Sequence, residues 1–211
     1  MTMLCSRCSL KIKPIVVSDI DGVLAKYHES VTAFNALYHN TPAPFMPYTG
    51  DEPFRDYLGL TKEQHRAMKL AYRQGGNKRF VPMYPGADDL INDIRFLGAE
   101  IWVATTRPFQ RLDNIDPDTV EWLQRNGIRV DGILSGEDKY EQLVNTVEKS
   151  RIVACFEDLP EQISMGLALE LPMFHVYRDH NQATRFAPGG NLRQAFVYAR
   201  NAIVEWENND G

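Results

Sequence analysis

The sequence predicts an α/β fold in which a parallel, five-stranded sheet is flanked by helices. Short apolar runs alternate with stretches that carry apolar residues at helical spacing, which is typical of parallel sheets. The apolar runs are continuous, as expected of strands that are covered on both faces. The predicted strands span residues 14–18, 100–104, 128–134, 151–156 and 173–177.

Five helices are predicted between and after these strands. Their apolar residues recur three or four positions apart, which places them on one face of each helix. Gly98 and Gly127 follow the last apolar positions of two helices, and Pro117 lies in the first turn of the helix that Gly127 ends. These helices span residues 86–97, 117–126, 138–149, 160–169 and about 191–206.

Residues 25–84 interrupt the alternation because they contain no convincing strand. Apolar spacing predicts one helix there, and Thr61 with Gln64 has the pattern of a capping box that opens a second. We therefore expect two domains. Residues 1–24 and 85–211 form a core, and residues 25–84 form a helical cap inserted after the first strand.

Composition excludes several classes of protein. The net charge of −5 over 211 residues argues against a protein that coats nucleic acid. No apolar run approaches the roughly 18 residues of a membrane span, and the N-terminus lacks the apolar region of a secretory signal. Three cysteines cannot form a disulfide framework, so we expect a reducing, cytoplasmic location. Cys5 and Cys8 form a CxxC in what we expect to be an N-terminal arm, with a zinc site shared between two chains as the alternative.

Polar residues gather where the predicted strands end, the edge at which parallel α/β sheets bind ligands. Clustered carboxylates repel one another unless a cation holds them, and hard oxygen ligands suit Mg²⁺. Hydroxyl, arginine and lysine side chains beside that ion suit a phosphate. The pattern predicts a divalent ion and a phosphoryl group sharing one pocket. The residues concerned are Asp19, Asp21, Thr105, Thr106, Arg107, Lys139, Glu157 and Asp158.

The first two carboxylates can do different chemical work. Asp19, directly after the strand, can attack phosphorus as a nucleophile and form an aspartyl-phosphate. Asp21, two residues later, can give a proton to the leaving alcohol and then activate water. Gly22 allows the backbone to leave the strand sharply.

Four segments in this order resemble the motifs of the haloacid dehalogenase (HAD) superfamily of phosphatases. They are VVSDIDGVLA at 16–25, IWVATTRP at 101–108, Lys139 within SGEDKYEQLV, and CFEDLPEQ at 155–162. The resemblance implies a Rossmann-like fold in which Asp19 is the nucleophile and Asp21 the acid/base.

The resemblance also implies ligands. Mg²⁺ would bind Asp19, the Asp21 backbone carbonyl and Asp158, while Glu157 would be either a ligand or a residue behind the ligands. Threonine and lysine of the motifs would bind phosphate, which implies Thr105 with Thr106, and Lys139. The five histidines show no ligand spacing, so none is placed in the site.

Two subfamilies of this superfamily resemble the sequence more closely than the superfamily as a whole. The cap position and the segment YPGADDLINDI resemble 5′(3′)-deoxyribonucleotidases. The TTR turn followed by NIDPDTVEWL resembles the phosphatase half of phage polynucleotide kinase–phosphatase, which implies a phosphate-binding role for Arg107.

We therefore expect a Mg²⁺-dependent phosphomonoesterase, specifically a 5′-nucleotidase acting on nucleoside monophosphates. One alternative is a polynucleotide 3′-phosphatase that acts on nucleic-acid ends, and another is a non-catalytic phosphate-binding protein. Aromatic residues near the cap hinges would stack on a base, and the best candidates are Tyr27, Phe80 and Tyr84. The sequence does not set the oligomeric state.

Overall fold

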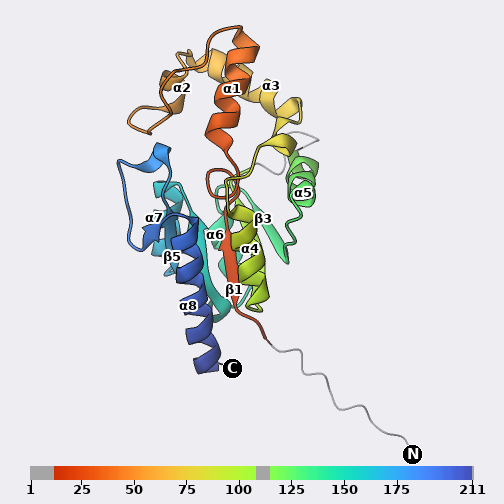
Figure 1. The fold of residues 1–211 in the computed structure, drawn as a ribbon, viewed down its shortest axis with the longest axis vertical. Coiled ribbons are helices and arrows are strands. Elements are labelled where there is room, and N and C mark those ends of the chain that lie inside the picture. The colour runs from red at the N-terminus through yellow and green to blue at the C-terminus, as the bar shows by residue number, and fades with distance from the viewer. Residues whose placement is uncertain (1–11, 108–114, 211) are drawn as a thin grey trace, which may run out of the picture.

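The computed structural model of the chain describes residues 12–107 and 115–210 (Figure 1). Six strands form one sheet in the order β3-β2-β1-β4-β5-β6, and every pair is parallel. The strands are β1 Ile15–Ser18, β2 Glu100–Thr105, β3 Gly132–Ser135, β4 Ile152–Glu157, β5 Met173–Val176 and β6 Gly189–Gly190.

The predicted α/β fold is confirmed, with two differences in the strands. The sheet has six strands rather than five, because the two glycines of β6 carry no apolar pattern that a sequence could reveal. The third strand starts at Gly132 rather than Ile128, which packs into the core ahead of the strand.

The sheet order creates a switch point between β1 and β4. The chain passes from β1 outward through β2 and β3, and then returns to the other side of β1 as β4. Val16 consequently pairs with Ile101 of β2 on one side and with Ala154 of β4 on the other. In open α/β sheets the ligand lies outside the strand ends at such a point.

Helices cover both faces of the sheet (Figure 1). Apolar residues of α4, α5 and α8 pack in one core cluster with Val16 of β1, while α6 and α7 pack in a second cluster with Ile15 and Val17. The period-two alternation of a strand places these residues on opposite faces. The helices are α4 Ala87–Phe96, α5 Ile115–Arg125, α6 Lys139–Thr146, α7 Pro160–Ala168 and α8 Leu192–Asp210, with short 3₁₀ turns η2 Lys149–Arg151 and η3 Asp179–Asn181.

Between β1 and α4 the chain forms helices that gather beyond the carboxyl ends of the strands (Figure 1). They are α1 Tyr27–His39, α2 Phe54–Tyr57, α3 Lys62–Gln74 and the 3₁₀ turn η1 Asn77–Phe80. The predicted capping box opens α3: the Gln64 N–H donates to Thr61 Oγ1 at 3.2 Å, and the Thr61 N–H donates to Gln64 Oε1 at 2.9 Å. The two chain segments that connect these helices to the sheet lie side by side, since Ala25 forms an antiparallel β-bridge with Met83.

Among the described residues, no helix has the length and apolar character needed to cross a membrane. Cys5 and Cys8 lie outside the described residues, whereas Cys155 is a free, buried thiol in β4.

Candidate active site

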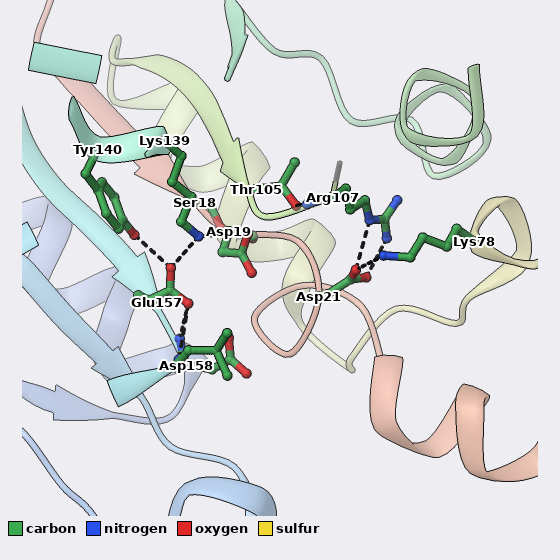
Figure 2. A network of polar contacts seen from close by, with 11 residues as sticks. Ser18, Asp19, Asp21, Lys78, Thr105, Arg107, Lys139, Tyr140, Glu157 and Asp158 are labelled. Atoms are coloured by element: carbon green, nitrogen blue, oxygen red, sulfur yellow. Dashed lines mark hydrogen bonds and ion pairs between the residues drawn. The ribbon is translucent and has the colours of Figure 1, made fainter. Parts of the chain in front are cut away.

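The structure brings the predicted site residues together beyond the ends of β1, β2 and β4 (Figure 2). Asp21 keeps 14% of its side chain exposed, and Thr106 is half-buried. The remaining predicted polar residues are buried, and they are Asp19, Thr105, Arg107, Lys139, Glu157 and Asp158.

Three of these carboxylates could hold a metal ion. Asp19, Glu157 and Asp158 each offer an oxygen, and the three oxygens lie within 4.8 Å of one another. Among the described residues, Asp19 Oδ1 and Asp158 Oδ1 are buried and accept no hydrogen bond. Burying a carboxylate oxygen without a partner is costly. Asp158 Oδ1 has none, and Asp19 Oδ1 has only an ion pair with Lys139, so both oxygens fit a bound cation.

The pKa of Asp19 also favours a bound cation. Burial raises the pKa of Asp19 to about 7, with Lys139 lowering it and Glu157 and Asp21 raising it further. A buried carboxylate therefore takes up a proton at neutral pH unless more positive charge is near it. A divalent ion would supply that charge and keep Asp19 ionised.

Glu157 differs from the other two carboxylates because its oxygens already have donors. Oε2 accepts from Lys139 Nζ at 2.5 Å and from the Tyr140 hydroxyl at 2.9 Å. Oε1 accepts the backbone N–H groups of Asp158 and Leu159 at 3.0 and 3.1 Å. A carboxylate with four donors has little capacity left for a metal ion.

Lys139 lies between two acids (Figure 2). Its ammonium is 2.5 Å from Glu157 and 3.2 Å from Asp19 Oδ1, although the geometry to Asp19 falls short of a hydrogen bond. Burial acts against the charged ammonium, but Asp19 and Glu157 together raise the pKa of Lys139 above its usual value. The first residue of α6 thus presents a fixed positive charge beside Asp19.

A close backbone approach joins the loops that follow β1 and β4. Gly22 has a φ of +91°, and a Cβ built there would lie 1.9 Å from Asp158 Oδ2. Arg178 holds the same loop, donating to the carbonyls of Gly22 at 2.8 Å and Val23 at 2.6 Å. Its guanidinium stacks 3.8 Å above the ring of Tyr84.

Asp21 is held by two cations from different parts of the chain. Arg107 donates through Nη2 to Oδ1 at 2.6 Å and through Nε to Oδ2 at 3.0 Å, and Lys78 of η1 donates to Oδ2 at 2.6 Å. Burial would raise the pKa of Asp21, but Arg107 and Lys78 hold it well below its usual range. Thr105 Oγ1 accepts the Arg107 N–H at 3.3 Å and so fixes the turn.

A histidine also belongs to the site, although the sequence analysis placed none there. His180 Nε2 lies 2.6 Å from Asp158 Oδ2, and only 6% of its side chain is exposed. The His28 ring packs against it, with ring centroids 4.1 Å apart and the ring planes tilted by 41°. His180 lies in η3, far along the chain from Asp158, so no sequence spacing could reveal this contact.

The structure places the three aromatic candidates for base stacking in different surroundings. A cavity of about 580 Å³ borders His180, and of the three aromatic candidates only Tyr84 lines it. Tyr27 packs instead against the Lys78 ammonium, 4.8 Å from its ring centroid. Phe80 is 60% exposed and contacts Arg125. Other lining residues include Phe45, Tyr48, Tyr57, Tyr177, His28 and Arg178.

Sequence reasoning missed Tyr140, Arg178 and His180 as contacts of the site, and it left the place of Lys78 open. Lys78 belongs to a basic stretch, 73–79, which the sequence allows either as a solvated face or as a guide for an anionic substrate. It is 5% exposed. The αL conformation of Gly76 starts the turn that points it inward.

Neither a comparison with family profiles nor one with curated proteins gives a match to this chain. Solved structures do match. A haloacid dehalogenase-like hydrolase from Streptococcus pneumoniae is 11% identical with a TM-score of 0.61, over 88% of this chain and 98% of that one. A predicted phosphatase from Clostridium acetobutylicum is 14% identical with a TM-score of 0.62, over 90% and 99%.

A third similar structure is CbbY from Rhodobacter sphaeroides in complex with phosphate, which is 18% identical with a TM-score of 0.54 over 85% of this chain and 93% of that one. At these identities the likeness establishes architecture. The six-stranded parallel sheet and its flanking helices are therefore those of the HAD fold.

Proposed function

We propose that this protein is a Mg²⁺-dependent phosphomonoesterase that acts through an aspartyl-phosphate on Asp19. One observation carries the proposal. At the switch point of the sheet, buried oxygens of Asp19 and Asp158 accept no hydrogen bond, and the Lys139 ammonium lies 3.2 Å from Asp19 Oδ1. This arrangement offers a cation site and a phosphate site that share one nucleophilic carboxylate.

The residues that would hold Mg²⁺ are Asp19 and Asp158 through their side chains and Asp21 through its backbone carbonyl. The close approach of Gly22 to Asp158 supports this set, because it brings the backbone of the first loop against the second ligand. When bound, Mg²⁺ neutralises the repulsion between Asp19 and the phosphate oxygens. Glu157, with its four donors, positions Lys139 instead of binding the ion.

The chemistry takes two steps. In the first, a carboxylate oxygen of Asp19 attacks phosphorus and the bond to the leaving oxygen breaks. Asp21, which takes up a proton once it leaves its ion pairs with Arg107 and Lys78, gives that oxygen the proton. In the second, Asp21 takes a proton from water, whose oxygen attacks the phosphorus, releasing phosphate and restoring Asp19. Lys139, together with Thr105 and Thr106, would bind the equatorial oxygens throughout.

The helical segment 25–84 is proposed to act as a cap over these steps. Its helices lie beyond the carboxyl ends of the strands, the end of the sheet at which the site residues lie (Figure 1). Closure of such a segment excludes water and completes the substrate site. The core would then consist of residues 1–24 and 85–211.

The proposed substrates are nucleoside monophosphates. The cavity that borders His180 supports this choice, because it is lined by Tyr48, Tyr57 and Tyr84, and aromatic side chains are what a base stacks on. The similar CbbY structure was solved with phosphate, and a second one with xylulose-(1,5)bisphosphate. A sugar phosphate is therefore the reference compound against which nucleotides should be compared.

A substrate panel tests the proposal. Initial rates would be measured on 5′- and 3′-nucleoside monophosphates, ribose 5-phosphate and a 3′-phosphorylated oligonucleotide, with Mg²⁺ and with excess chelator. We expect Mg²⁺-dependent phosphate release and the highest kcat/KM for a mononucleotide. Asp19→Asn should abolish turnover, whereas Asp88→Asn, an exposed acid on α4, should not. Full activity in chelator would refute the metal role, and preference for the oligonucleotide would favour the end-repair alternative.

A further inference from the structure

Two buried cations lie beside the proposed phosphate site. Lys78 and Arg107 both reach the Asp21 carboxylate, with three hydrogen bonds of 2.6 to 3.0 Å. Lys78 is 5% exposed and Arg107 is 2% exposed. Two buried cations that converge on one carboxylate form a site built for an anion, and Asp21 occupies it in this structure.

The pair has binding capacity that Asp21 does not use. Two cations, Arg107 and Lys78, share the one Asp21 carboxylate. Arg107 Nη1 is buried and, among the described residues, has no hydrogen-bond partner. A second anionic oxygen at this place would therefore find an unused donor.

The position of this pair separates it from the group that is transferred. Figure 2 shows Glu157 and Asp158 on one side of Asp19, and Arg107 with Lys78 on the other, beyond Asp21. A phosphoryl group attacked by Asp19 would be held by Lys139 and the metal ion. The Lys78–Arg107 pair would then face a part of the substrate further from the reacting phosphorus.

Resting on the proposed function, and widening its substrates beyond nucleoside monophosphates, we propose that Lys78 and Arg107 bind a second anionic group of the substrate, a phosphate or a carboxylate. A nucleotide or sugar phosphate that carries this group would bind more tightly than one that does not. The second anion takes the place of the Asp21 carboxylate. Asp21 is thereby released from the ion pair and can face the leaving oxygen. Lys78, supplied by η1 of the helical segment, is then a specificity-determining residue of the site.

Binding measurements test this independently of turnover. Calorimetric affinities would be measured with Mg²⁺ in the Asp19→Asn background for three matched pairs of ligands. The pairs are adenosine 3′,5′-bisphosphate with AMP, ribose 1,5-bisphosphate with ribose 5-phosphate, and phosphoglycolate with methyl phosphate. We expect about tenfold tighter binding of the doubly anionic member in at least one pair.

Adding Lys78→Met should remove this preference and leave the affinity for the singly anionic member within about threefold. Lys78→Arg should retain the preference because it keeps the charge. Arg66→Met removes an exposed charge from the neighbouring α3 and should change neither affinity. Circular dichroism would check folding, with Lys78→Gln as the substitute if Lys78→Met fails to fold.

Three results would overturn the proposal. They are the absence of any preference in the Asp19→Asn background, a preference that survives loss of the Lys78 charge, and an equal loss of affinity for both members of a pair. The two proposals can fail separately. If the native protein hydrolyses no substrate but the Lys78-dependent preference is measured, only the phosphatase assignment falls. If the native protein hydrolyses substrate but shows no such preference, only the proposal for Lys78 and Arg107 falls.

Discussion

Gly22 lies so close to Asp158 that a Cβ on Gly22 would be 1.9 Å from Asp158 Oδ2. The loop after β1 and the loop after β4 therefore meet in direct contact at the proposed metal site. Only a residue without a side chain allows this approach. The φ of +91° at Gly22 independently favours glycine.

Gly22→Ala should disable the site while the fold survives. The added methyl group would push the Asp158 carboxylate away, so we expect kcat/KM to fall by about a hundredfold or more. Gly98→Ala is the matched control, because Gly98 has a φ of +90° with nothing within 4 Å of the added Cβ. Both variants should lose about 1–2 kcal/mol of stability from backbone strain, but only Gly22→Ala should lose activity. Equal activities in the two variants would contradict the proposed contact.

Glu157→Gln should separate a positioning role from a ligand role. The change removes the charge that holds Lys139, so we expect KM for substrate to rise and kcat/KM to fall by about tenfold or more. The Mg²⁺ concentration for half-maximal activity should stay within about threefold, because Glu157 is not a proposed ligand. Glu170→Gln, which breaks an exposed ion pair with Lys149, serves as the control. A large rise in the Mg²⁺ requirement would make Glu157 a ligand.

His180→Ala should weaken Mg²⁺ binding, although His180 is not itself a proposed ligand of the ion. His180 fixes the Asp158 carboxylate through a contact of 2.6 Å, and loss of such a partner typically costs about 10–100-fold in metal affinity or activity. Excess Mg²⁺ should restore part of the rate. His39→Ala, in the last turn of α1, should leave the Mg²⁺ requirement unchanged. An unchanged requirement in His180→Ala would remove His180 from the site.

The stability of the protein should depend on His28 at acidic pH. Burial lowers the pKa of His28 to about 3, with His180 and Lys69 acting in the same direction and Asp21 in the opposite one. Above about pH 6.5 the folded and unfolded chains both hold His28 neutral, so it adds no pH dependence. As the pH falls below that value, the unfolded chain takes up a proton that the folded chain refuses, and stability is lost towards pH 3.

Urea unfolding at pH 7.5 and pH 5 would measure this effect. Between these two values the wild-type protein should lose about 2 kcal/mol more than His28→Gln, which cannot take up the proton. Equal losses in the two proteins would show that His28 is accessible to protons in the folded state.

Much of the fold follows from local patterns in the sequence. The apolar runs predicted β1, β2, β4 and β5, because strands that are covered on both faces must be apolar throughout. The capping box of Thr61 marked the start of α3. Strand β6 could not be predicted, since Gly189 and Gly190 join the sheet through backbone hydrogen bonds alone.

The residues of the site likewise fall into those that local sequence patterns predict and those that they do not. Residues that follow strands could be placed from the sequence, because parallel strands bring their carboxyl ends to one edge. Asp19 and Asp158 are of this kind. Lys78 and His180 arrive from a 3₁₀ turn of the helical segment and from the turn after β5, and their contacts depend on how distant segments pack. The ion pairs of Asp21 were missed for the same reason.

The central claim is that Asp19 becomes phosphorylated during turnover. Wild-type enzyme would be mixed with substrate and Mg²⁺, quenched in acid at short times, digested, and examined by mass spectrometry. We expect the peptide that contains Asp19 to gain the mass of one phosphoryl group, with no gain in Asp19→Asn or in excess chelator. Turnover by the wild-type enzyme with no phosphorylated peptide at any time, together with near-native activity of Asp19→Asn, would contradict the account.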